Sequence, residues 1–177
     1  MSRIEHIRLL ADYNEWMNVK LYEAAAALPA DEVHADRKAF FGSIFGTLGH
    51  IARADTIWLK RFATHPSPPA VLDAMRDVPM PTMAEDMFAD FAALTDYRRR
   101  LDRIIGEWAR SLAEHDLDVE FAYSTLRGAP SRKNFFGIVM HFFNHQTHHR
   151  GQATTLFSQA GIDVGSTDLL VLVPEIT

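Results

Sequence analysis

The chain has 177 residues, of which 47% are hydrophobic and 23% are charged, and it carries a formal net charge of −5 at pH 7. A chain of this size and composition buries its own core, which excludes a largely disordered protein. The acidic balance, without a continuous basic face, excludes the phosphate backbone of nucleic acids as a partner. Because the chain has no cysteine, disulfides, cysteine-ligated metals and a protein thiol nucleophile are also excluded.

We expect one domain over residues 1–177 and a cytoplasmic protein. The first residues lack the apolar core of a signal peptide. No stretch approaches the ~20 apolar residues that cross a bilayer, so no membrane partner is expected. The one basic run, at 98–100, is flanked by Asp96 and Asp102, which indicates a solvated helix face with intrahelical ion pairs rather than a DNA-binding surface.

The first predicted elements are two long helices. Apolar residues recur every three or four positions over 2–28, with Asn14 as the polar exception, and predict the first helix. A polar linker over 31–38 follows. The second helix is predicted over 40–63 and ends before the proline cluster at 66–69, which cannot continue a helix.

A proline-rich segment over 64–81 separates the second helix from the third. It is predicted to be irregular apart from a short helical turn near 71–75. Thr82 is predicted as the N-cap of the third helix, with Glu85 at the capping-box position, and this helix runs to about Glu114.

A short extended excursion is predicted between the third and fourth helices. Apolar residues alternate within 118–128, and the residues at 128–130 are typical of a turn. Ser131 is predicted to cap a fourth helix that reaches about Ala160. The apolar run at 169–173 is too short to assign. Four long helices predict an all-α four-helix bundle, in which sites form from side chains that point inward from facing helices.

Histidine carries the functional signal, because four of the nine histidines lie within nine residues of the fourth predicted helix. Residues four apart share one helix face, so His141, His145 and His149 form a narrow stripe. Gln152 lies on the same stripe, and His148 lies beside it. Stacked imidazoles compete for partners when neutral, whereas a divalent cation satisfies two such nitrogens at about 2.0 to 2.1 Å. The stripe therefore predicts a metal site.

His50, near the middle of the second predicted helix, is the candidate for a third ligand. Its face of the helix carries small residues, among them Ser43, Gly46 and Ala54, which leave room for an ion and its bound ligand. Bulky side chains, including Phe41, are expected to point the other way. Three imidazoles and an open position suit catalytic zinc or nickel.

Alternatives stay open at this point. A lone core histidine bonded to a backbone carbonyl is commoner than a metal ligand, so His50 alone does not establish a site. His141 could replace either ligand of the pair, and His148 is expected beside the site or at the surface. The His-Glu-x-x-His pattern of zinc proteases, with glutamate as general base, is absent. The other histidines are expected in solvent: His6, His34, His65 and His115.

Three motifs lie in the predicted helices. They are Asn14-Glu15-Trp16-Met17-Asn18 in the first, Leu48-Gly49-His50-Ile51-Ala52-Arg53-Ala54-Asp55 with Trp58-Leu59 in the second, and Asn144-His145-Gln146-Thr147-His148-His149-Arg150-Gly151-Gln152 in the fourth. Through these motifs, the chain resembles the DinB family over nearly its whole length. This family of four-helix bundles includes YfiT-like proteins and proteins that depend on mycothiol or bacillithiol. The resemblance implies an up-down-down-up bundle, often dimeric, with a divalent metal held by His50, His145 and His149.

Some members of this family are thiol S-transferases or isomerases. The resemblance therefore implies a metal-dependent enzyme that activates an exogenous low-molecular-weight thiol, or water, and acts on a small-molecule substrate. The thiol must be external because the chain has no cysteine. A bound metal lowers the pKa of the thiol, so no carboxylate base is needed. A metal-dependent hydrolase and a non-catalytic metal-binding stress protein are the alternatives.

Further side chains are candidates for contacts around the ion. Gln152, one turn beyond His149, is expected to orient a ligand or to donate a hydrogen bond beside the metal. Asn14, Trp58, His141 and His148 are further candidates beside the site. The fourth helix is also apolar on a second side, which the other helices or a second subunit must cover. We expect a homodimer.

Overall fold

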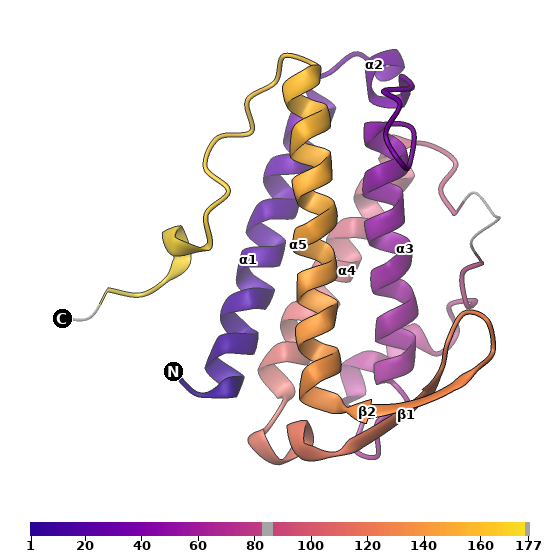
Figure 1. Cartoon of the computed structure of the whole chain (residues 1–177), viewed down its shortest axis with the longest axis vertical. Coiled ribbons are helices and arrows are strands. Elements are labelled where there is room, and N and C mark those ends of the chain that lie inside the picture. Colours follow the sequence, from indigo (N-terminus) through magenta and orange to yellow (C-terminus); the bar gives the residue numbers. More distant parts are fainter. Residues whose placement is uncertain (83–86, 176–177) are drawn as a thin grey trace.

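The computed structural model describes residues 1–82 and 87–175, which form a bundle of long helices with a hairpin at one end (Figure 1). The long helices are α1 (Arg3–Ala26), α3 (Ile44–Phe62), α4 (Phe91–Ser111) and α5 (Phe135–Gln159). The shorter elements are the helix α2 (Ala30–His34), the 3-10 helices η1 (Ala70–Met75), η2 (Glu114–Asp118) and η3 (Leu169–Leu172), and the strands β1 (Glu120–Ser124) and β2 (Pro130–Asn134). The predicted all-α four-helix bundle is confirmed.

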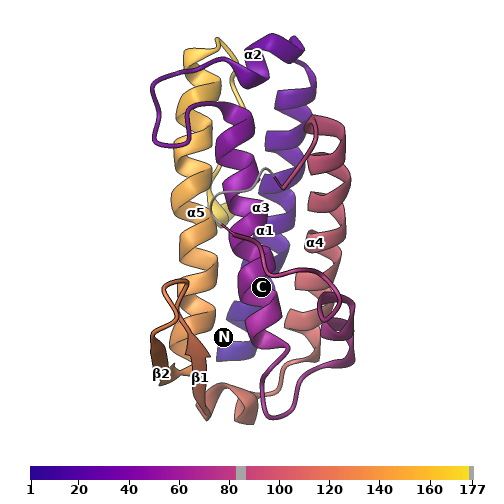
Figure 2. The same cartoon turned by 90° about the vertical axis from the view of Figure 1, so that its right-hand side faces the viewer.

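The four long helices are arranged up-down-down-up, as Figures 1 and 2 show. α1 packs against α4 and α5, and α3 packs against the same two helices. Their apolar faces meet in a core rich in aromatic rings, in which Phe62 stacks on Trp108 with ring centroids 4.8 Å apart. Because α3 and α5 are neighbours, residues far apart in the sequence meet at their interface.

The long helices α1 and α3 begin at serine caps. The Ser2 hydroxyl accepts a hydrogen bond from the backbone N–H of Glu5, so α1 starts one residue after its predicted start. In α3, the Ser43 hydroxyl accepts from the N–H of Gly46 at 3.0 Å. The predicted start of this helix at residue 40 is therefore wrong. Gly42, with φ at +73°, lies in the turn just before the cap.

Two further boundaries differ from the predictions. The segment predicted as a linker over 31–38 overlaps α2, which buries Val33. α4 starts at Phe91 rather than after Thr82, because the carboxylate of Asp90 accepts the N–H of Ala93 at 2.8 Å and caps the helix. The predicted capping-box residue Glu85 lies outside the described residues.

The predicted excursion between the last two helices is an antiparallel hairpin. Strand β1 and the turn at Gly128, with φ at +79°, are confirmed, whereas β2 was not predicted. β2 lacks apolar residues and is mostly exposed, so it carries no hydrophobic alternation and is defined by backbone pairing alone. Asn134, rather than Ser131, caps α5 and accepts the N–H of Gly137 at 3.1 Å.

The helix α5 ends where the sequence predicts, and its second apolar side is covered mostly within the chain. The helix ends before Gly161, which has φ at +77°. On the second apolar side, Val139 and Phe143 are buried and Phe136 and Met140 are partly buried against the chain's own core, so the other helices cover most of it. Within residues 1–82 and 87–175, no helix has the length and apolar composition needed to cross a membrane.

Candidate metal centre

The interface of α3 and α5 brings His50 together with His145 and His149. One ring nitrogen of each side chain lies within 4.8 Å of one from each of the other two. Nitrogens bound to a tetrahedral zinc at 2.0 to 2.1 Å are about 3.3 Å apart. The Nε2 atoms of His145 and His149 are 3.1 Å apart, close to that spacing. The histidine pair of α5 and the histidine of α3 could therefore hold a metal ion with small side-chain movements.

Gln152 fixes the orientation of one of these rings. The Nδ1–H of His149 donates to Oε1 of Gln152 at 2.7 Å, because an amide oxygen only accepts. The unprotonated nitrogen of His149 is then Nε2, which faces His145. An outer partner of this kind orients a ligating imidazole and raises its basicity. Gln152 thus contacts His149 by accepting a hydrogen bond, whereas the alternative expected from the sequence was a donated one.

Burial keeps the three imidazoles in the neutral form that binds metals. Burial, with smaller contributions from His149 and Arg53, lowers the pKa of His50 to about 4. Burial and the neighbouring imidazoles lower the pKa of His145 to about 3. The pKa of His149 is also lowered, chiefly by burial. Nδ1 of His50 is buried and has no hydrogen-bond partner among the described residues, as expected of a nitrogen available to an ion.

These pKa values predict how zinc affinity depends on pH. Protons compete with a metal only below the pKa of the ligating group, which is about 6.5 for an unperturbed imidazole. With the pKa of His50 at about 4, that of His145 at about 3 and that of His149 lowered, metal affinity is expected to fall less between pH 7 and 5 than it would with three unperturbed imidazoles. Competition titrations with a chelator of known proton affinity measure this. A fall of more than about a hundredfold between pH 6 and 5, as three unperturbed imidazoles would give, would contradict the prediction.

Phe41 covers the ring of His50, contrary to the prediction that it points away. Their ring centroids are 4.0 Å apart, with planes 19° from parallel. The prediction was wrong because it placed Phe41 in the helix, whereas Phe41 belongs to the preceding loop. A Cβ added to Gly46 would lie 2.1 Å from the carbonyl oxygen of Phe41. Gly46 therefore gives room to this loop rather than to an ion.

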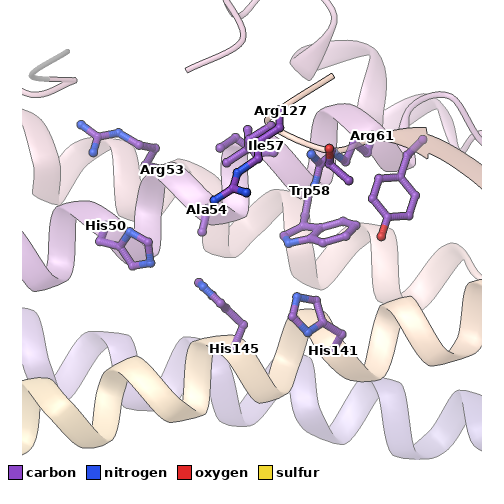
Figure 3. A pocket seen from close by; sticks show the side chains of 12 residues that line it. His50, Arg53, Ala54, Ile57, Trp58, Arg61, Arg127, His141 and His145 are labelled. Carbon is purple, nitrogen blue, oxygen red and sulfur yellow. The ribbon is translucent and has the colours of Figure 1, made fainter. Parts of the chain in front are cut away.

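A cavity of about 490 Å³ opens beside His50 and His145. Figure 3 shows His141 and His145 rising from α5 toward α3, whose Trp58 lies above His141. The Trp58 and His141 rings meet edge to face, with centroids 5.3 Å apart. β1 and the hairpin turn form part of the wall through Tyr123 and neighbouring residues. The structure therefore places the two candidates Trp58 and His141 in a pocket that reaches the histidines.

The other two candidates do not line the cavity, although the ring of His148 contacts that of His149, with centroids 4.8 Å apart. His148 is exposed, and its Nε2 lies 3.4 Å from Nε2 of Gln152. Asn14 is buried between helices and does not line the cavity. Its Nδ2–H donates to Asp102 at 3.2 Å, and its amide oxygen accepts from Arg150. His65, expected in solvent, is instead buried, and its Nδ1 accepts the N–H of Ser67 at 3.0 Å.

Asn14 is part of a buried polar network that sequence reasoning missed. Arg98 bonds to Asp55 at 2.5 Å and to Asp102 at 3.0 Å, and Gln146 donates to Asp55 at 2.9 Å. Arg98 is only 2% exposed, so its prediction as part of a solvated face is wrong. The helical spacing could have predicted that Arg98 is buried, because Arg98 lies on the same face of α4 as the buried residues Leu94 and Leu101.

Comparisons with known proteins point to one family. The family model described as "DinB family" matches residues 1–174. Among curated proteins, the chain is similar to "Protein DinB" of Bacillus subtilis (strain 168), with 24% identity over 161 residues that cover 90% of this chain and 88% of that protein. No solved structure gives a significant match.

Proposed function

Because this chain belongs to the DinB family, we propose that it is a metal-dependent enzyme that activates an external low-molecular-weight thiol and joins the thiolate to a small electrophile. One observation carries the proposal. Three mostly neutral imidazoles each place one ring nitrogen within 4.8 Å of a ring nitrogen of the other two. Two of these imidazoles line a cavity of about 490 Å³. Three imidazole ligands leave a tetrahedral ion one open position, which distinguishes catalytic sites from closed structural ones.

In this proposal His50, His145 and His149 hold a divalent ion, with zinc or nickel as the expected metal. When bound, such an ion lowers the pKa of a coordinated thiol or water. Gln152 keeps Nε2 of His149 free of its proton. Phe41 covers one face of His50 and excludes water there. The pocket holds the electrophile while a C–S bond forms and the bond from the attacked carbon to its leaving group breaks, and the thiol proton and the leaving group pass to solvent.

The pocket favours a thiol over water as the activated group. A free thiol has a pKa of about 8.5, whereas the pKa of water is 15.7, so water needs far more activation. Hydrolytic sites commonly add a carboxylate base, but none of the described residues that line this cavity is Asp or Glu. Asp55 follows the cavity residue Ala54 in the sequence, but its carboxylate is buried and bonded to Arg98.

Steady-state assays test the proposal. Protein purified without a histidine tag is loaded with zinc or nickel and given 1-chloro-2,4-dinitrobenzene with and without a thiol such as cysteine or glutathione. Turnover that needs both metal and thiol, and that is lost in His145→Ala, is the expected result. Hydrolysis of p-nitrophenyl acetate without thiol would favour a hydrolase. No turnover with an extended panel of thiols, electrophiles and esters would favour a non-catalytic metal-binding protein.

We also propose a homodimer in solution. The described chain leaves a cluster of apolar residues exposed near its end, at Leu170, Val171 and Val173, with Leu170 77% exposed. Pairing of two chains would remove such residues from water. Sedimentation equilibrium is expected to give twice the chain mass of 20.0 kDa. A single-chain mass at micromolar concentration would contradict the proposal.

A further inference from the structure

The pocket beside the histidines is cationic in an otherwise acidic protein. Its described lining includes Arg61 and Arg127 and no acidic residue, whereas the chain as a whole carries −5. A cleft lined by charges of one sign and apolar walls concentrates ligands of the opposite sign. The local charge therefore favours an anionic ligand.

Arg61 is held in place for such a ligand. Its Nη2–H donates to the carbonyl oxygen of Ser124 at 2.8 Å. Its guanidinium lies over the rings of Trp58 and Tyr123, 4.6 and 5.0 Å from their centroids. A guanidinium fixed in this way loses little side-chain entropy when it binds an oxyanion. The hairpin thus positions the arginine through a backbone carbonyl and one ring.

Arg127 adds a second cation from the loop that joins β1 to β2, and it is exposed. Figure 3 shows it on the same side of the pocket as Ile57 and Arg61, across from His141 and His145. Between the arginines and the histidines, the walls are mainly apolar and aromatic. The lining thus offers two arginines near the hairpin, the apolar side chains Ile57 and Trp58 of α3 beside them, and imidazoles from both α3 and α5.

We propose that this pocket binds a small oxyanion with an aromatic body, a carboxylate or a phosphoryl group whose charge is met by Arg61 and Arg127. The aromatic body packs on Trp58 and Ile57. A volume of about 490 Å³ suits a ligand of metabolite size. The proposed anion site does not rest on the proposed function, because Arg61 and Arg127 line the pocket whether or not the histidines hold a metal.

Calorimetric titrations of the metal-free protein at pH 8, where imidazoles are uncharged, test the anion site. The probes share a phenyl ring: benzoate and phenylphosphonate are anionic, benzyl alcohol is neutral and benzylamine is cationic. At least one anion is expected to bind about fivefold or more tightly than the neutral and cationic probes. The anion that binds more tightly identifies the preferred group.

A matched pair of variants assigns the preference to the pocket. Arg127→Gln is expected to weaken binding of the preferred anion about fivefold and to leave benzyl alcohol unchanged. Arg132→Gln removes the same charge from the same hairpin, but Arg132 pairs with Glu120 at 3.0 Å and does not line the cavity, so no change is expected. Equal effects of the two variants, equal affinity for anionic and neutral probes, or no saturable binding up to about 10 mM would overturn the proposal.

The outcomes also separate this proposal from the proposed function. Anion binding that depends on Arg127, in a protein with no turnover, would support the anion site and contradict the enzyme. Metal- and thiol-dependent turnover with no preference for anions would support the enzyme and overturn the anion site.

Discussion

His145→Ala is expected to abolish stoichiometric zinc binding, with affinity reduced at least about a hundredfold. Loss of an outer hydrogen-bond partner alone costs 10- to 100-fold in comparable sites, and His145 is placed as a direct ligand. His50→Ala is expected to have a comparable effect, because the other two nitrogens then come from one helix and leave the site open toward α3. Elemental analysis of tag-free protein after dialysis, with a chelator competition for affinity, measures both.

Two neighbouring histidines provide matched controls for this experiment. His148→Ala changes an exposed residue next to the ligand His149 and is expected to retain metal. His141→Ala tests the other histidine of the stripe, whose ring centroid lies 6.0 Å from that of His145. Metal retained in both His50→Ala and His145→Ala would contradict the assignment. Metal lost in His141→Ala would show that His141 is a ligand.

The convergence of the histidines could be predicted because it depends on helix periodicity. His145 and His149 are one turn apart on one helix, and that relation holds wherever the helix lies. His50 needed one further fact, that α3 and α5 are neighbours. The family resemblance, rather than the spacing, implied that packing. The stripe also predicted that Gln152 would be close enough to bond to His149.

The parts of the site that were not predicted come from segments without periodicity. Phe41 reaches His50 from a loop whose path depends on the turn at Gly42 and on the space above Gly46. Arg127 reaches the pocket because β1 and β2 pair through their backbones. Residue type alone does not show where such backbones run. The pocket's charge could therefore not be derived from the sequence.

The buried network gives the bundle a polar centre behind the metal site. Gln146 and Arg150 each follow a histidine of the pair by one residue on α5, so they point away from the site and into the core. Gln146 bonds to Asp55 of α3, and Arg150 bonds to Asn14 of α1. Polar bonds of this kind are satisfied in one register of the helices only. The network thereby fixes how the face of α5 that carries His145 and His149 meets α3.

Arg98→Met is expected to lower the free energy of unfolding by about 3 to 5 kcal/mol at pH 7, because it leaves Asp55 and Asp102 buried without the cation between them. Burial already raises the pKa of Asp102 to about 6, although Arg98 opposes this shift. Removing Arg98 raises the folded-state pKa of both carboxyls further above the unfolded value of about 3.9. The folded variant then holds protons that the unfolded chain releases, so its stability falls as pH rises.

The loss of stability is therefore expected to be smaller at pH 5 than at pH 7, as measured by urea unfolding of both proteins at each pH. Arg99→Met is the matched control. Arg99 is adjacent in the sequence, but its side chain is 76% exposed and pairs with Asp96 at 3.3 Å, so a change within about 0.5 kcal/mol is expected. Equal losses in the two variants would contradict a buried ion network. A loss in Arg98→Met that grows toward pH 5 would show that the carboxylates are not the groups left uncompensated.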